Sequence, residues 1–223
     1  MMEHIPIAKT GAYVVLADRY CGDARTSLDW IFLQQQHSGD VVVIGDGARD
    51  RNLVLNSAPN DYFPSSLALG DAIVTKRIDA TIGALGADCG LVGLASNEDV
   101  AAVIHVGWRG LLADIIKNTI AAMHMMDATR IWSVIGPCIH SECYEFDYNL
   151  AKEISLHINY NVVGETSLGK PSLDLPLAIN KLLERENVDV LDTVASCTAC
   201  DERWFSHRAR RDSMRHGLGV LWR

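Results

Sequence analysis

Three apolar runs follow one another between residues 80 and 106, and they constrain the fold more than any other part of the chain. Residues 80–89, 90–96 and 101–106 show little alternation between apolar and polar side chains. Strands with this pattern are buried on both faces, because an exposed face would carry polar residues at every second position. The runs therefore predict a sheet that is covered on both sides, as in α/β proteins.

Further strands are predicted before and after these runs. They are expected at residues 12–17 and 41–47, within 66–79, at 130–135 and 190–196, and in the C-terminal GVLWR. Residues 27–36 fit either a short helix or an extended segment. Residues 48–70 lack periodicity and contain Pro-Asn-Asp and Phe-Pro steps, which indicate a surface loop.

Helices are predicted at three places after residue 106. Apolar residues spaced three to four apart indicate a helix over 111–123. Asp147 and Asp174 are placed to cap helices over 150–158 and 175–186. Because no repeat, low-complexity segment or linker interrupts the chain, we expect one α/β domain covering residues 1–223.

Composition excludes several classes of protein. A net charge of −8 argues against a nucleic-acid partner, because neutralising phosphates requires a basic face. No stretch approaches the roughly 18 apolar residues that a membrane span requires, and the N-terminus lacks the apolar core of a signal peptide. Six cysteines without such a signal suggest reduced thiols, so we expect a cytoplasmic protein without a membrane partner.

Cys89 and His105 stand out within the apolar runs. Cys89 has small neighbours that leave its sulfur accessible, although a free cysteine is often only a small buried hydrophobe. His105 lies inside an apolar strand, where an imidazole must find either a polar partner or a metal. His37, at the beginning of a predicted strand, would complete a His-Cys-His set, although alone it reads as a solvated loop residue. Three such ligands leave one position of tetrahedral zinc open, as in catalytic sites, and copper also accepts them.

An anion site is indicated where the strand containing His105 passes into the next helix. Gly107 and Gly110 allow a close backbone approach, and a helix N-terminus attracts anions. Arg109 could grip a phosphate or carboxylate with two hydrogen bonds. A tight turn with an exposed arginine explains the same sequence equally well.

The C-terminal third holds a Cys-x-x-Cys pair and a cluster of arginines. Cys197 and Cys200 lack an obvious fourth ligand for a zinc knuckle and lack the adjacent helix of a redox pair. The roles of Cys138 and Cys143 are open. The arginines could hold an anionic substrate, pair with acidic residues or be solvated; they are Arg203, Arg208, Arg210, Arg211 and Arg215.

Several motifs occur together in the order of one known family. They are Gln36-x-His-Ser-Gly39, Ala87-Asp88-Cys89, His105-Val-Gly-Trp-Arg-Gly110, Ile135-Gly-Pro-Cys-Ile139, Cys143-Tyr-Glu-Phe146, Cys197-Thr-Ala-Cys-Asp201 and Phe205-Ser-His-Arg208. The chain thereby resembles the laccase-domain proteins, formerly called polyphenol oxidases, of the YfiH/YlmD-like group. That group is regarded as zinc-dependent purine nucleoside phosphorylases.

The resemblance implies a fold of mixed sheets with flanking helices and the metal ligands His37, Cys89 and His105. It also implies phosphorolysis of adenosine, inosine, guanosine and 5′-methylthioadenosine, with adenosine deamination attributed to the same family. Nucleoside and phosphate would be the small-molecule partners, with Cys89, His105 and Arg109 in catalysis and with Arg109 and Arg208 binding substrate.

The chain departs from the family pattern in two places. Only 36 residues precede His37, so the N-terminal region that usually adds substrate contacts is expected to be short. After Ser206 the sequence HRARRDSMRHG replaces the family's second arginine and glycine-rich stretch.

Three other functions remain open on the sequence. A copper-dependent polyphenol oxidase fits the older family name, but such enzymes use many histidines and this chain has eight. The other two are a metal-free hydrolase with a Cys-His pair and a non-catalytic binding protein with a relict site. The oligomeric state is open as well.

Overall fold

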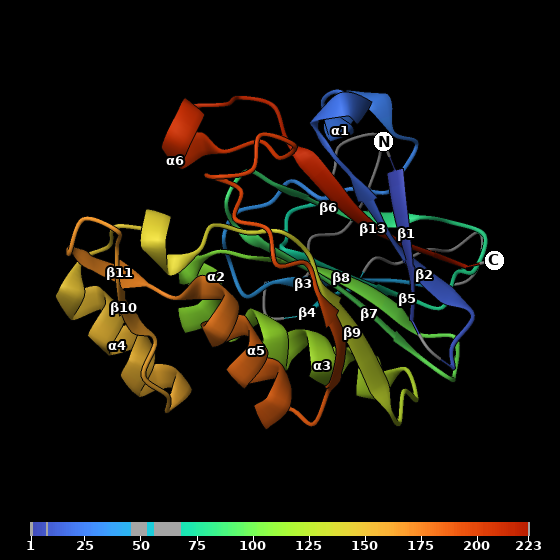
Figure 1. Cartoon of the computed structure of the whole chain (residues 1–223). Coiled ribbons are helices and arrows are strands. Elements are labelled where there is room, and N and C mark those ends of the chain that lie inside the picture. Colours follow the sequence, from blue (N-terminus) through green and yellow to red (C-terminus); the bar gives the residue numbers. More distant parts are fainter. Residues whose placement is uncertain (1, 8, 46–52, 56–67, 223) are drawn as a thin grey trace.

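The computed structural model describes residues 2–7, 9–45, 53–55 and 68–222 of the chain. Two sheets dominate it (Figure 1). The larger is mixed and has the strand order β12 (Asp189–Thr193), β9 (Ile131–Ile135), β7 (Gly90–Ser96), β8 (Ala101–Val106), β5 (Ala72–Thr75), β3 (Val41–Ile44), β4 (Leu53–Leu55). The smaller is antiparallel, with the order β1 (Met2–Pro6), β2 (Ala12–Ala17), β13 (His216–Trp222), β6 (Ile82–Gly86). The prediction of an α/β fold with mixed sheets is confirmed.

Helices and the smaller sheet cover the two faces of the seven-stranded sheet. The helices α3 (Ile115–Met125) and α5 (Leu175–Arg185) pack on one face, and β2, β6 and β13 lie over the other (Figure 1). The helix α4 (Tyr148–Ile158) packs beside α5 and against a hairpin of β10 (Val163–Glu165) and β11 (Pro171–Leu173). Every residue of β7 and β8 is buried, as the non-alternating sequence predicts.

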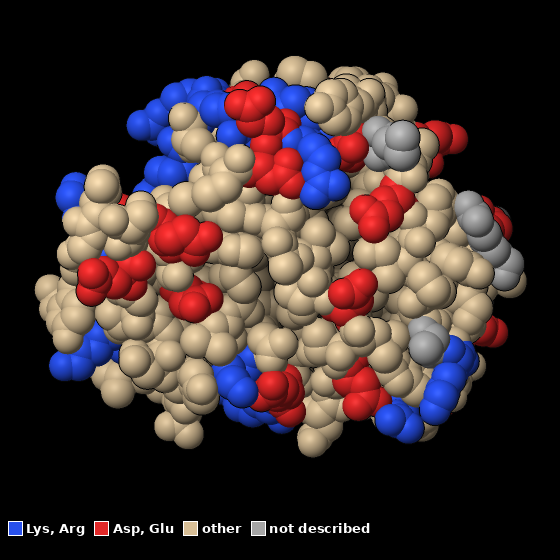
Figure 2. Space-filling view, in the orientation of Figure 1, with Lys and Arg blue, Asp and Glu red and all other residues tan. Residues whose placement is uncertain are grey.

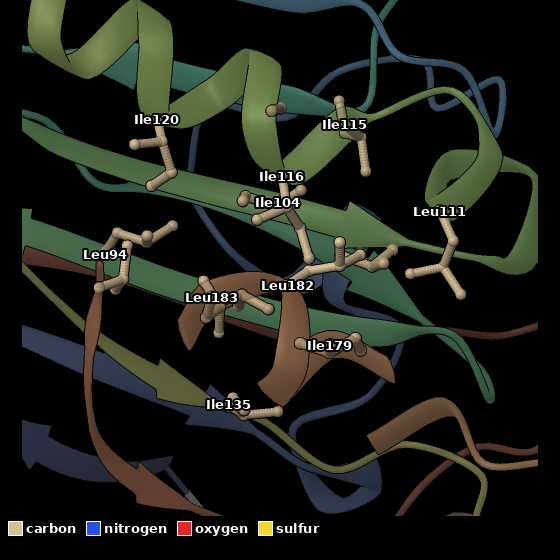
Figure 3. Packing of buried hydrophobic residues seen from close by; sticks show 14 of the residues in the cluster. Leu94, Ile104, Leu111, Ile115, Ile116, Ile120, Ile135, Ile179, Leu182 and Leu183 are labelled. Atoms are coloured by element: carbon tan, nitrogen blue, oxygen red, sulfur yellow. The ribbon is translucent and has the colours of Figure 1, made fainter. Parts of the chain in front are cut away.

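Two hydrophobic cores separate the three layers. Between α3, α5 and the seven-stranded sheet, Ile104 and Leu94 meet Ile116, Ile120 and other aliphatic side chains (Figure 3). Between the two sheets, a Cβ at Gly93 would lie 2.5 Å from Val14 Cγ2, so the sheets approach too closely there for any larger residue. Successive residues of β8 alternate between the two cores, and His105 is on the side of the smaller sheet.

The prediction of one helix over 111–123 is corrected. Two helices occupy the region, α2 (Trp108–Leu112) and α3, and Asp114 between them has a left-handed φ of 56°. Asp is among the few residues that adopt this conformation without a large penalty. The Asn118 amide donates to the carbonyls of Ala113 and Gly39, so it satisfies a backbone group that the break leaves open. Apolar spacing continues across the break, which is why it does not appear in the sequence.

Other predicted boundaries hold with small shifts. Asp147 and Asp174 cap α4 and α5 by accepting hydrogen bonds from the amides of Leu150 and Leu177. The strand predicted at 190–196 ends early, because β12 covers Asp189–Thr193, and the C-terminal strand begins three residues before Gly219. After α1 (Ala24–Ser27), the segment to residue 36 carries no further helix.

The loop predicted at 48–70 falls mostly outside the described residues, which resume at 68; within it, Leu53–Leu55 form β4. Elements that were not predicted are the strands β1, β4, β10 and β11, the four-residue helices α1 and α6 (His207–Arg210) and the 3-10 helices η1 (Arg19–Cys21) and η2 (Ser141–Cys143). None of the helices described reaches the length that crossing a bilayer requires.

His216 at the start of β13 makes stability sensitive to acid. Its side chain is fully buried against Trp204, and neither ring nitrogen has a hydrogen-bond partner among the described residues. Burial, helped by the charges of Arg215 and Arg19, lowers the pKa of His216 from 6.5 to about 3. The unfolded chain therefore binds a proton below pH 6.5 that the folded chain excludes, so stability is lost as the pH falls.

We expect the free energy of unfolding to drop by about 2 kcal/mol between neutral pH and pH 5 through His216 alone. His216→Leu removes this titration and should flatten that part of the pH profile, as urea unfolding at several pH values would reveal. An equally steep profile in the variant would assign the acid sensitivity to other groups.

Candidate metal centre

Three segments of the chain bring His37, Cys89 and His105 together. Cys89 lies in the connection by which the chain passes from β6 in the smaller sheet to β7 in the larger. His105 is on β8, directly opposite Leu91 of β7, and His37 lies in the loop before β3. The side-chain donor atoms of the three residues all lie within 4.8 Å of one another. The grouping inferred from the sequence therefore exists in the fold.

The spacing of these donors suits a small cation. His37 Nε2 lies 3.7 Å from Cys89 Sγ, and the two imidazole rings have centroids 4.7 Å apart at an interplanar angle of 80°. Zinc bonds of 2.0–2.3 Å in a tetrahedron place a nitrogen and a sulfur about 3.5 Å apart. A thiolate and two imidazoles could thus hold one metal ion with little movement.

Gly107 makes room for this arrangement. A Cβ at that position would lie 2.8 Å from His37 Cδ2 and 3.3 Å from Cys89 Sγ. Any side chain there would push His37 away from the other two donors. The sequence suggests this glycine for a tight turn. In the structure, its lack of a side chain leaves room for His37 and Cys89 in the candidate metal centre.

Asp71, which sequence analysis did not single out, holds both histidines. Its carboxylate accepts hydrogen bonds from three successive backbone amides, those of Gln36, His37 and Ser38, at 2.7–3.1 Å, and one from the Ser38 hydroxyl. Such a run of amides forms a concave anion site, and His37 has the left-handed φ of 60° that shapes it. The loop carrying His37 is therefore folded around a buried carboxylate.

The same carboxylate fixes the orientation of His105. Asp71 Oδ1 lies 2.8 Å from His105 Nδ1, and both side chains are buried. An ionised carboxylate only accepts, so Nδ1 carries the hydrogen and Nε2 is left to face the centre. Burial alone would raise the pKa of Asp71, but the bonds from His105 and Ser38 overcome it and lower the pKa to about 2. Carboxylates of this kind commonly orient metal-ligating histidines.

The two histidines also lower the pKa of the Cys89 thiol. Burial would raise the pKa of Cys89, but His105 and His37 lower it to about 6. Conversely, burial would lower the pKa of His105, but Cys89 and Asp71 raise it to about 9. Near neutral pH the sulfur is thus a thiolate, which is the form that binds metals or attacks carbon.

Asp88 links Cys89 to the C-terminal part of the chain. Its φ of 103° is strained for a residue with a side chain, and its carboxylate accepts bonds from Thr198 Oγ1 at 2.8 Å and from the Arg208 amide at 2.6 Å. These bonds hold the strained residue in place and set the direction of the adjacent cysteine. The sequence showed Asp88 only as part of a motif.

A cavity of about 740 Å³ opens over the centre. His37, Cys89 and His105 line one part of its wall, and the remaining wall combines aromatic and cationic side chains. The aromatic residues are Trp30, Phe32, Trp108 and Tyr144, and the cationic ones include Arg25, Arg109, Arg208 and Arg215. A volume between about 300 and 1,000 Å³ is typical of sites for small organic ligands.

The predicted substrate arginines, Arg109 and Arg208, both line this cavity. The guanidinium of Arg109 stacks on Trp108 with its Cζ 4.2 Å from the ring centroid, and within the described structure it has no ion-pair or hydrogen-bond partner. Arg208 lies over Tyr144 and donates to the carbonyl of Glu145 at 2.7 Å. Arg109 therefore retains its full capacity to bind an anion.

The rest of the arginine cluster serves different purposes. Basic side chains gather over α6 with acidic ones among them (Figure 2). Arg203 pairs with Asp201, while Arg210 donates to Asp212 and to three backbone carbonyls. Only Arg208 and Arg215 of the cluster reach the cavity.

Fold and site together define an α/β protein with a candidate His-Cys-His metal centre beneath a ligand-sized cavity. The chain belongs to the family described as multi-copper polyphenol oxidoreductase laccase, whose model matches residues 15–223. It is 31% identical to an adenosine deaminase, RL5, of an unknown prokaryotic organism, over 85% of this chain and 72% of that protein. It is 29% identical to a purine nucleoside phosphorylase of Clostridium acetobutylicum, over 86% of this chain and 78% of that protein.

Solved structures share the fold. A Neisseria meningitidis protein gives a TM-score of 0.76 at 18% identity, covering 99% of this chain and 98% of its own. YlmD of Geobacillus stearothermophilus gives a TM-score of 0.74 at 21% identity, covering 98% of this chain and 93% of its own. The resemblance inferred from the motifs is therefore confirmed at the level of family and fold.

Proposed function

We propose that this chain is a zinc-dependent purine nucleoside phosphorylase, acting on adenosine, inosine, guanosine or 5′-methylthioadenosine, with adenosine deamination as a second activity of the same site. The observation that carries the proposal is the cavity, because it joins a candidate metal-binding set, aromatic rings and an arginine that pairs with none of the described residues. The names of three relatives, one an adenosine deaminase and two purine nucleoside phosphorylases, support the substrate class but not the individual nucleosides.

Phosphorolysis places specific demands on the residues around a nucleoside. Phosphate attacks the anomeric carbon, the bond from that carbon to the purine nitrogen breaks, and the base leaves with a proton, giving the free base and ribose 1-phosphate. Arg109 can hold the phosphate by two charge-assisted hydrogen bonds. Trp30, Phe32, Trp108 and Tyr144 give the cavity aromatic walls against which a purine could pack. The main requirement is that the site stabilises the charge that develops on the ribose and the base.

The donor set fits zinc. His37, Cys89 and His105 would hold the ion, and Asp71 would orient two of these ligands. Bound there, zinc would act as a Lewis acid that polarises an oxygen or activates a water. Copper is the alternative metal. Among the described residues, however, candidate metal groups include the histidines His37, His105 and His140 only, which is few for the several copper centres of a multicopper oxidase.

A second candidate rests on a specific observation. Asp71, His105 and Cys89 form a chain of orienting acid, base and low-pKa thiol, which is the arrangement of metal-free cysteine nucleophiles. A hydrolase of that type would need no metal. The cytoplasmic location, the absence of nucleic-acid and membrane partners, the catalytic roles of Cys89, His105 and Arg109, and substrate binding by Arg109 and Arg208 stay predictions.

One assay separates these functions. Untagged protein is analysed for metal, and hypoxanthine release from inosine is followed with and without phosphate; adenosine deamination is measured in parallel without phosphate. We expect zinc in the protein, phosphate-dependent release, and loss of turnover after chelation that zinc restores. Phenol oxidation with bound copper would establish the oxidase instead, and turnover that survives chelation would establish the metal-free nucleophile. Zinc without turnover of any purine nucleoside would contradict an enzymatic role.

A further inference from the structure

A second group of thiols lies away from the centre already described. Cys143, at the end of η2, meets Cys197 and Cys200 from the turn that follows β12. The three sulfur atoms lie within 4.8 Å of one another, and those of Cys143 and Cys200 are 3.2 Å apart. The sequence showed only the Cys-x-x-Cys pair, because the third cysteine is 54 residues before the first of them.

The surroundings of Cys197 supply further donors. Its sulfur is buried and accepts a hydrogen bond from the His140 amide at 3.4 Å. The amides of Cys200 and Asp201 both donate to the Cys197 carbonyl, at 3.1 and 2.9 Å, which closes the turn and places the two cysteines of the pair on one side of it. A ring nitrogen of His140 and a carboxylate oxygen of Glu142 lie within 4.8 Å of the Cys197 sulfur.

We propose that Cys143, Cys197 and Cys200 bind a structural zinc ion. His140, which lies near the Cys197 sulfur but beyond 4.8 Å from at least one of the other two, would turn from Glu142 to supply the fourth ligand. Three thiolates with one imidazole form a closed tetrahedral set, which is typical of structural rather than catalytic zinc. Soft thiolate ligands favour zinc over magnesium or calcium. A disulfide would use only two of the three converging sulfurs and would leave the third without a role, whereas a metal ion uses all of them.

The ion would tie together two walls of the cavity. Cys143 directly precedes Tyr144, and the turn that carries Cys200 leads to Arg208, which stacks on Tyr144. Thr198, between the two cysteines of the pair, donates to Asp88, the neighbour of Cys89. The proposed zinc therefore supports the cavity from behind without facing it, and its presence does not depend on the function proposed for the cavity.

The test is the zinc content of the full-length chain purified under reducing conditions in zinc-replete medium. We expect about two zinc ions per chain in the wild type and about one in both Cys200→Ser and Cys89→Ser. Cys21→Ser is the matched control, because Cys21 belongs to neither thiol group, and it should retain both ions. Cys200→Ser should also unfold at a temperature several degrees lower, because a structural metal adds to folding stability.

Cobalt provides a readout that does not require Cys200→Ser to fold. Cys89→Ser protein reconstituted with Co²⁺ should keep a strong thiolate-to-cobalt absorption band from the remaining three-thiolate site. A single zinc ion in the wild type, lost in Cys89→Ser and unchanged in Cys200→Ser, would overturn the proposal. So would a Cys143–Cys200 disulfide found by mass mapping of protein purified with reductant.

Discussion

Replacing Cys89 by serine is expected to remove the metal ion held with His37 and His105 and to lower kcat/KM for inosine phosphorolysis by at least about 10³-fold, equivalent to about 4 kcal/mol of transition-state stabilisation. The physical reason is the loss of the only anionic ligand of the set. The histidines lower the pKa of Cys89 to about 6, so wild-type sulfur is charged at neutral pH, whereas a serine hydroxyl is neutral and hard. Metal analysis and steady-state kinetics on the same samples measure both effects.

The control for Cys89→Ser is Cys21→Ser, a thiol-to-hydroxyl change at a half-buried cysteine that does not line the cavity. It should leave zinc content and kinetics unchanged. Full metal content together with full turnover in Cys89→Ser would contradict the assignment of the site. Lost turnover with undiminished zinc would instead identify Cys89 as a nucleophile rather than a ligand.

Much of the central fold could be predicted because its signals are local. The unbroken apolar runs of β7 and β8 require cover on both faces, and they have it. The capping aspartates before α4 and α5 act through amides three residues away, so their effect is visible in the sequence. The break at Asp114 is equally local, but Asp is neutral enough in either conformation that nothing in the sequence marks it.

The site could be predicted only in part, because its supports depend on strand pairing. Asp71 reads as an ordinary turn residue before a short strand; it becomes the support of both histidines only because β5 pairs with β8 and faces the loop before β3. Cys143 likewise meets Cys200 through the packing of two loops that are far apart in the chain. Motifs identified His37, Cys89 and His105, while the residues that orient them required the fold.

Asp71→Asn is the second substitution with a large expected effect, and it leaves all three proposed metal ligands in the chain. We expect metal affinity at the His37–Cys89–His105 centre to fall by about 10- to 100-fold. An amide offers one acceptor oxygen where the carboxylate offers two, and its NH₂ group would face hydrogen-bond donors. Backbone amides of the His37 loop, or Nδ1 of His105, would lose their acceptor in a buried setting. His105 would then be free to adopt the tautomer that turns a hydrogen toward the metal position.

The same substitution should cost about 3 kcal/mol of folding stability at neutral pH, because it breaks a buried, hydrogen-bonded charge network. The direction in which this stability contribution changes with pH follows from the pKa of Asp71, which folding lowers from 3.8 to about 2. The ionised carboxylate stabilises the fold above pH 4, and that contribution disappears as the pH falls through 2, so the difference between wild type and variant should shrink in acid.

Urea unfolding and zinc competition titrations measure the two effects, with the exposed Asp99→Asn as the matched control. Wild-type zinc affinity in a correctly folded Asp71→Asn protein would mean that the fold holds the histidines without this carboxylate. A loss of stability with unchanged affinity would confine Asp71 to a structural role, whereas a joint loss at constant kcat for the zinc-saturated variant would identify it as the residue that positions the metal ligands.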